Sequence, residues 1–171
     1  MSYQLTIEPL GQTIEVEDGQ SILDASLRAG IYLPHACCHG LCATCKVQVV
    51  DGEVDHGEAS NFALMDYERE EGMCLACCAV PQSDVVIEAD VEVEPDALNL
   101  PVRDYEGAVS RLEKLTPTIM GVWIRLDDAE GLRFQAGQYV NLHVPGERAA
   151  RAFSLASMPS RATEVELNIR L

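Results

Sequence analysis

Seven cysteines gather in two short segments of the chain, four between positions 37 and 45 and three between positions 74 and 78. Cys37, Cys42 and Cys45 are separated by four and then two residues. This spacing, with one distant cysteine, is typical of the thiolate ligands of a [2Fe–2S] cluster. Gly40 and Ala43 are small enough to let the loop backbone approach the sulfur atoms closely. The spacing therefore predicts a cluster that accepts one electron at a time.

The fourth ligand is expected from the second cysteine segment. Residues 77–84 resemble the segment that carries the last cluster ligand in plant-type ferredoxins. The resemblance implies Cys77 as the fourth ligand, with Cys74 and Cys78 as small apolar core residues. Cys38 is then expected to be a bystander beside the cluster, and the alternative is that it replaces the preceding cysteine as a ligand.

Two other uses of the cysteines compete with the cluster. The Cys-x2-Cys pairs at 42–45 and 74–77 have the spacing of a zinc-binding structural module, which would leave Cys37 without a role. A disulfide framework is disfavoured because the cysteines are clustered and no apolar signal segment comes before the first expected strand. His35 and His39 are expected to lie near the cluster without binding it, since four thiolates complete the site. Reduced thiols favour a cytoplasmic location.

The charge of the chain changes sharply near position 100. Residues 1–100 hold 19 acidic residues against three basic ones, and residues 101–171 hold nine of each, so the first part carries the whole net charge of −16. The change falls in an acidic, proline-containing stretch, which predicts a first domain over 1–94, a linker over 95–102 and a second domain over 103–171. The acidic surface argues against nucleic-acid binding and suits either solubility or docking to a basic partner. No run of about 20 apolar residues is present, so no membrane span is expected.

The first domain is predicted to be α+β. Alternating apolar residues on either side of a Pro-Leu-Gly turn predict a hairpin, and Ser21 with Asp24 has the form of a capping box that starts a short helix ending at Gly30. A second short helix is expected within residues 58–70, with three apolar side chains directed inward: Phe62, Leu64 and Met65. The expected strands are 3–7, 14–16, Lys46–Val50 and Val85–Ala89. A mixed sheet with a helix across it is the β-grasp arrangement, which the ferredoxin resemblance also implies.

Beyond the predicted linker the sequence changes to short strands separated by turn residues, without helical periodicity. Several short strands in succession indicate a β-barrel. The expected strands are Gly107–Leu112, Gly121–Leu126, Gln138–Val144, Arg151–Ala156 and Glu164–Leu171.

Two segments of the second domain resemble the flavin-binding barrel of the ferredoxin-NADP reductase superfamily. They are residues 134–140 and the Arg-x-aromatic-Ser motif that begins at Arg151. The resemblance implies that Arg151 binds the FAD pyrophosphate, Phe153 contacts the flavin ring and Ser154 faces its N5 atom. Arg170 is a weaker candidate for a flavin contact. The alternative is an ordinary barrel strand with Phe153 in the core.

The chain as a whole resembles the reductase component of multicomponent phenol hydroxylases. The resemblance rests on its first residues, on the cysteine loop with the strand after it, and on the segments 62–66 and 75–79. It implies an NADH-dependent oxidoreductase in which electrons pass from NADH through FAD and the [2Fe–2S] cluster to a di-iron hydroxylase component. The fold implied is a β-grasp ferredoxin-like domain followed by an incomplete antiparallel β-barrel of the flavin reductase type.

The chain ends inside the expected barrel, before the rest of the flavin site and before any nicotinamide domain. It is therefore expected to be a C-terminally truncated fragment that keeps the cluster and lacks NADH oxidation. No catalytic acid, base or nucleophile is expected. The alternatives are a stand-alone ferredoxin-type electron carrier, or the related reductase of a toluene, benzoate or methane oxygenase, which would share these motifs.

Overall fold

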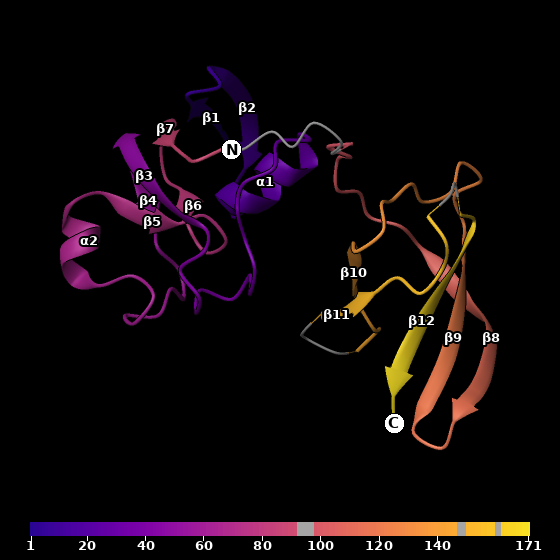
Figure 1. The fold of residues 1–171 in the computed structure, drawn as a ribbon. Helices are drawn as coiled ribbons and strands as arrows, with labels where there is room; N and C mark the ends of the chain where they lie inside the picture. The colour runs from indigo at the N-terminus through magenta and orange to yellow at the C-terminus, as the bar shows by residue number, and fades with distance from the viewer. Residues whose placement is uncertain (92–97, 147–149, 160–161) are drawn as a thin grey trace. The chain divides into compact units, whose positions relative to one another are not determined.

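The computed structural model describes residues 1–91, 98–146, 150–159 and 162–171. The chain divides into two units, Met1–Val102 and Arg103–Leu171 (Figure 1). The predicted linker, 95–102, begins outside the described residues. Its described end belongs to the first unit, since the Val102 amide donates to the Leu27 carbonyl at 3.0 Å.

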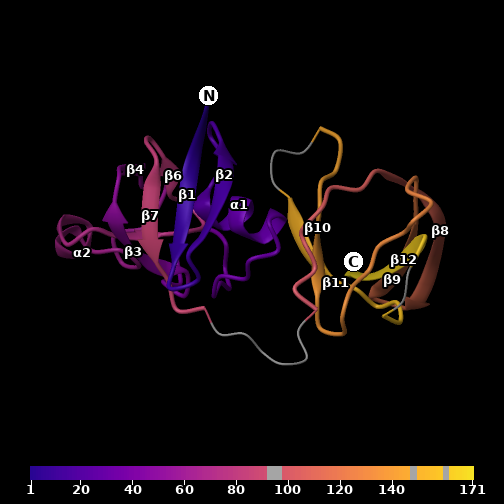
Figure 2. The ribbon, with the colours of Figure 1, turned by 90° about the horizontal axis from the view of Figure 1, so that it is seen from above.

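A five-stranded mixed sheet organises the first unit, with the strands in the order β2-β1-β7-β3-β5. β1 and β7 run parallel at its centre and lie side by side in Figure 2, and the other neighbouring strands are antiparallel. β4 and β6 form a separate two-stranded sheet. The elements are β1 (Ser2–Glu8), β2 (Gln12–Glu17), α1 (Ile22–Arg28), β3 (Lys46–Asp51), β4 (Val54–Asp55), α2 (Asp66–Glu70), β5 (Met73–Leu75), β6 (Val80–Pro81) and β7 (Val85–Glu88). The predicted α+β class is confirmed.

The predicted hairpin is confirmed as β1 and β2. Leu5 and Ile7 of β1 are fully buried while their neighbours are more exposed, because successive side chains of a strand point to opposite faces. Val16 is buried on β2. These side chains share one core with the buried residues of α1: Ile22, Leu23 and Ala25.

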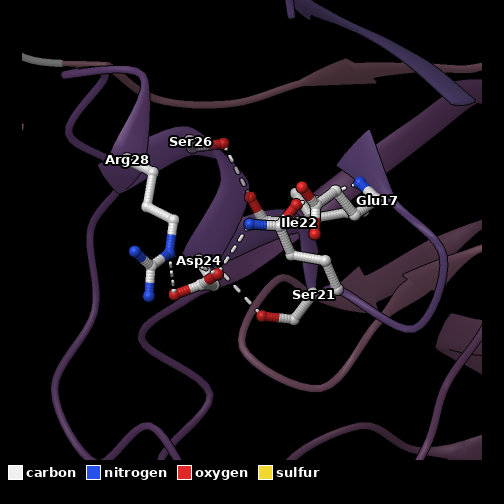
Figure 3. Close-up of polar contacts among 7 residues, drawn as sticks. Glu17, Ser21, Ile22, Asp24, Ser26 and Arg28 are labelled. Carbon is white, nitrogen blue, oxygen red and sulfur yellow. Dashed lines mark hydrogen bonds and ion pairs between the residues drawn. The ribbon is translucent and has the colours of Figure 1, made fainter. Parts of the chain in front are cut away.

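The start of α1 is fixed by the N-cap half of the capping box that the sequence predicts. The Ser21 hydroxyl accepts a hydrogen bond from the Asp24 amide at 3.2 Å, which satisfies one of the free amides of the first turn (Figure 3). Asp24 also pairs with Arg28 at 2.9 Å, one helical turn on. After the helix Gly30 adopts a φ of 79°, a conformation that glycine reaches without steric cost. The helix therefore has a sharply defined beginning and end.

The short helix expected within residues 58–70 is present, but the expected inward placement of Phe62 and Met65 is wrong. Only Asp66–Glu70 is helical, and of the three side chains expected inside, Leu64 is buried while Phe62 is 94% exposed and Met65 is 47% exposed. The preceding residues form turns instead. The Ser60 hydroxyl accepts a hydrogen bond from the Phe62 amide at 3.2 Å, and the Ser60 carbonyl accepts one from the Leu64 amide at 2.9 Å. A serine hydroxyl that binds a nearby backbone amide competes in this way with helical hydrogen bonding.

The second unit consists of two antiparallel sheets, in the strand orders β12-β9-β8 and β10-β11. A bridge between Leu155 and Leu167 connects the end of β11 to β12. Each of the five predicted strands is present with shifted ends, as a partial barrel. The strands are β8 (Gly107–Thr116), β9 (Ile119–Leu126), β10 (Tyr139–Leu142), β11 (Arg151–Ser154) and β12 (Glu164–Arg170).

The core of the second unit is small. It is built around Phe134, Ala162 and Val165, with Leu167 also fully buried. All ten residues of β8 are exposed. Among the described residues, no helix of either unit is long and apolar enough to cross a bilayer.

Candidate metal centre

The loop between α1 and β3 carries three of the predicted ligands. Within its cysteine-bearing part, residues 37–45, three residues have left-handed backbone conformations: Cys38 with a φ of 55°, Gly40 with 70° and Ala43 with 61°. Such angles are uncommon for residues other than glycine and turn the chain sharply. The backbone of the loop therefore turns repeatedly between Cys37 and Cys45. Cys42 lies between these two cysteines, and Cys45 is buried.

Backbone amides of this loop point at the sulfur of Cys37. The amides of His39 and Leu41 each lie 3.4 Å from Cys37 Sγ. Hydrogen bonds to the ligand sulfurs are a feature of iron–sulfur sites. The local fold thus prepares Cys37 as a ligand.

Cys37 and Cys42 form one pair of neighbouring thiols. Hydrogen bonding to the Thr44 side chain, followed by bonding to the Cys37 backbone, lowers the pKa of Cys42 to about 6. Cys42 Sγ lies 3.3 Å from Thr44 Oγ1. At neutral pH Cys42 is therefore mostly thiolate, on an exposed part of the loop.

Cys45 and Cys77 form the second pair. Hydrogen bonding with Cys77, followed by burial, raises the pKa of Cys45. In the metal-free chain Cys45 therefore holds its proton and shares it with Cys77. A metal would displace that proton, because cysteine binds metals as the thiolate.

Backbone hydrogen bonds hold Cys77 opposite the loop. The amide of Ala76 donates to the carbonyl of Cys45 at 2.9 Å, and the first amides of α1, from Ile22 and Leu23, donate to the carbonyls of Ala79 and Ala76 at 2.9 and 2.8 Å. The start of α1 therefore anchors both sides of Cys77. These contacts join segments about thirty to sixty residues apart in the sequence, which no local pattern reveals.

The two pairs suit the requirements of a two-iron cluster, in which four cysteines serve two irons. A structural zinc site built from four cysteines requires all of them around a single ion. The pairing of Cys42 with Cys37 and of Cys45 with Cys77 thus fits a two-iron cluster.

The remaining cysteines have different surroundings. Cys74 is fully buried on β5, where desolvation raises its pKa to about 12, so it is a core thiol. Cys38 is half-buried, with its Sγ 3.9 Å from the Ala36 carbonyl oxygen. Cys78 is also half-buried, and its Sγ lies 3.6 Å from Cys77 Sγ. Burial raises the pKa of Cys78 as well. The contact between Cys77 and Cys78 was not predicted from the sequence.

The two histidines near the loop bond to backbone carbonyls. Nδ1 of His35 lies 2.7 Å from the Leu33 carbonyl oxygen, and Nδ1 of His39 is hydrogen-bonded to the Cys37 carbonyl. One ring nitrogen of each is thereby engaged away from any sulfur. Their absence from the ligand set stays a prediction.

The residues predicted to bind flavin lie on and around β11. Arg151 and Phe153 are two residues apart on this strand and therefore share a face, with Arg151 exposed and Phe153 half-buried. Ser154, the last residue of the strand, is exposed on the opposite face, where it pairs with Tyr139 of β10. Arg170 is exposed at the end of β12. Arg151 and Phe153 thus present a charged group and a ring on one face, as the motif predicts, whereas Ser154 does not share it.

The chain matches known proteins along its whole length. Residues 5–82 match the 2Fe-2S iron-sulfur cluster binding domain family. The reductase component of phenol 2-monooxygenase from a Pseudomonas strain is 65% identical over 171 residues, which are 100% of this chain and 48% of the relative. A phenol hydroxylase protein from Acinetobacter pittii is 58% identical, over 99% of this chain and 48% of its own length.

The chain is therefore similar to phenol hydroxylase reductase components over its whole length. It spans about half the length of the curated relatives it matches. Among solved structures, a cytochrome P450 reductase from Amycolatopsis has a TM-score of 0.86 at 37% identity, over 98% of this chain and 49% of that chain. A ferredoxin reductase of carbazole 1,9a-dioxygenase, solved in an FAD apo form, has a TM-score of 0.73 at 29% identity, over 99% of this chain and 52% of that chain. This fold is therefore shared with a cytochrome P450 reductase and with a ferredoxin reductase.

The low pKa of Cys42 gives a direct test of the metal-free loop. In the cluster-free chain at pH 7, iodoacetamide is expected to modify Cys42 faster than any other cysteine, because the thiolate is the reactive form. The rate should be half-maximal near the pKa of about 6 and should fall as the pH drops below it. Mass spectrometry of the digested chain measures the modification at each site. Buried Cys74, with its pKa raised to about 12, serves as the slow internal control. A Cys42 profile that rises only above pH 8 would contradict the assignment.

Proposed function

We propose that this chain carries the cluster of an NADH-dependent reductase that delivers electrons to the di-iron oxygenase component of an aromatic hydroxylase. The observation that carries the proposal is the pairing of Cys37 with Cys42 and of Cys45 with Cys77 in a chain 65% identical to a phenol 2-monooxygenase reductase component. Residues 1–94 would form the cluster domain and 103–171 the beginning of the FAD domain.

The four paired cysteines are the proposed ligands. Amides of the loop donate hydrogen bonds to the Cys37 sulfur, Thr44 stabilises the thiolate of Cys42, and the bonds from α1 hold the segment of Cys77 in place. When bound, the cluster and FAD supply the conversion of a two-electron hydride transfer into single-electron steps. In the second unit Arg151, Phe153 and Ser154 are the proposed FAD contacts.

Phenol is the proposed substrate of the whole system. The relatives named for phenol oxidation are 65% and 58% identical to this chain. The reductase subunit of an aromatic O-demethylase is 39% identical, and reductase components of propane 2-monooxygenases are up to 36% identical. Cytoplasm is the proposed location because cluster assembly requires reduced thiols.

The proposed docking surface for the oxygenase surrounds the loop. Leu41, within the loop, is 67% exposed, and Phe62 is 94% exposed. A bond of 3.0 Å from the Ser60 amide to the Gly40 carbonyl holds the segment of Phe62 against the loop. Exposed aromatic residues are frequent anchors in protein interfaces. The acidic residues of the first unit would add long-range attraction to a basic partner surface, which weakens as salt is added.

Stopped-flow mixing tests the function. The reconstituted chain is reduced with dithionite, freed of excess reductant and mixed anaerobically with the oxygenase component of a phenol hydroxylase. The proposal predicts reoxidation of one electron per chain, at a rate that falls as salt rises. Reoxidation no faster than with an unrelated di-iron protein would contradict the proposed partner.

Replacing Phe62 with alanine is expected to slow this electron delivery about tenfold, because removal of an interface anchor typically costs more than about 1 kcal/mol of binding free energy. Stopped-flow measurement under subsaturating oxygenase reports the change. The visible spectrum should stay the same, since Phe62 is 94% exposed and contributes little to the core.

Val50→Ala is the matched control for Phe62→Ala. Val50 is 59% exposed and lies near the end of β3 that is farther from Cys45. It should leave the rate unchanged. If the two substitutions changed the rate of electron delivery equally, Phe62 would not be part of the docking surface.

A further inference from the structure

Cys78 is next to a proposed ligand in the sequence and also faces the cluster loop. Its Sγ lies 3.6 Å from Cys77 Sγ, within hydrogen-bond distance for sulfur. A Cβ added to Gly40 would lie 2.8 Å from the same Sγ, so the loop backbone packs directly on this sulfur. The Cys78 thiol is therefore fixed against both the loop and a proposed ligand.

The direction of the hydrogen bond follows from the role of Cys77. A cysteine that binds iron does so as the thiolate, which has no proton to donate. In the hydrogen bond between the two sulfurs, the S–H of Cys78 must then be the donor and the sulfur of Cys77 the acceptor. A thiol is a weak donor, but an ionised acceptor strengthens the bond.

We propose that Cys78 is a positioning residue that donates a hydrogen bond to the Cys77 sulfur and so raises the reduction potential of the cluster. The inference rests on the proposed function, because it requires Cys77 to be a ligand. Reduction adds negative charge to the cluster, part of which is carried by its ligand sulfurs. A donor to one of these sulfurs stabilises the reduced form more than the oxidised form.

A purely space-filling role for Cys78 makes a different prediction. The side chain packs at the edge of the core, so any small replacement there would disturb the packing to a similar degree. Alanine and serine are both close to cysteine in size, but only serine keeps a donor at this position. The two replacements therefore separate hydrogen bonding from packing.

The test is the reduction potential of the full 171-residue chain with its cluster reconstituted, measured by spectroelectrochemistry under anaerobic conditions. Cys78→Ala is expected to lower the equilibrium constant for one-electron reduction about threefold, which is ~28 mV at 59 mV per tenfold change. Cys78→Ser should match or exceed the potential of the unmodified chain. Cys74→Ala, which removes a fully buried thiol on β5, is the control and should leave the potential unchanged.

Several results would overturn the inference. An unchanged reduction potential in Cys78→Ala, or equal shifts of the potential in the alanine and serine variants, would show that Cys78 only fills space in the packing. Loss of the cluster in Cys78→Ala with retention in Cys77→Ala would make Cys78 the ligand. Failure of the unmodified chain to bind a cluster would overturn the proposed function as well, and is thereby distinguished from failure of the hydrogen bond alone.

Discussion

Cys77→Ala is expected to remove most of the bound iron and to abolish the visible absorption of the [2Fe–2S] cluster. One of the two irons would lose a protein ligand and would keep only one cysteine, the buried Cys45. Iron and acid-labile sulfide assays after anaerobic reconstitution measure the loss. Because Cys78 Sγ is only 3.6 Å from Cys77 Sγ, the substitution is also made together with Cys78→Ser, which prevents the neighbouring thiol from replacing the ligand.

Cys74→Ala is the matched control for this loss. Cys74 comes from the same cysteine segment, but it pairs with Val47 across the sheet and is fully buried in the core. Its replacement should cost about 1 kcal/mol of stability and leave the cluster spectrum intact. If Cys74 proved essential and Cys77 dispensable, the proposed ligand set would be wrong.

Gly52→Ala is expected to destabilise the first unit by more than about 3 kcal/mol, through both backbone strain and overpacking. Gly52 has a φ of 92°, and a Cβ at this position would lie 2.2 Å from the carbonyl oxygen of Asp84 and 2.9 Å from the Cα of Val85. These are backbone atoms at the start of β7, one of the two central parallel strands, so relief would require the sheet itself to shift. Urea unfolding followed by circular dichroism measures the change.

The chain provides two internal comparisons for Gly52→Ala. Gly19 has a φ of 79° but nothing within 4 Å of an added Cβ, so Gly19→Ala should show only the backbone cost of about 1 kcal/mol. The single tryptophan, Trp123, belongs to the second unit, where Arg111 stacks on its ring at 3.5 Å. The urea concentration at which the Trp123 fluorescence changes should therefore be the same in Gly52→Ala as in the unmodified chain. Equal destabilisation by the two alanine substitutions would show that close packing at Gly52 is unimportant.

The parts of the fold that sequence alone predicted are those with local causes. Alternation of apolar residues placed the hairpin of β1 and β2, and the cap at Ser21 placed the start of α1. The exposure of Phe62, which was expected to point inward, also has a physical reason, because the Ser60 amide bonds to the distant Gly40 carbonyl and the Ser60 side chain supports a turn. The strands β4, β5 and β6 are two or three residues long, which is too short for a periodic signal.

The candidate site also has a part that local sequence patterns predict and a part that depends on distant contacts. Spacing alone pointed to Cys37, Cys42 and Cys45, whereas Cys77 needed a resemblance to known ferredoxins. The pairing of Cys45 with Cys77 depends on a hydrogen bond between Ala76 and Cys45 across the sheet. No sequence pattern predicts the contact of Cys78 with both Cys77 and the loop, since it arises from the packing of one segment on the other.

The central claim is that two pairs of cysteines hold a [2Fe–2S] cluster, and the composition of the anaerobically purified chain tests it most directly. The expected result is about two iron atoms and about two acid-labile sulfides per chain, with the visible absorption of an iron–sulfur protein. The result that would contradict the claim is a colourless protein holding about one zinc ion per chain.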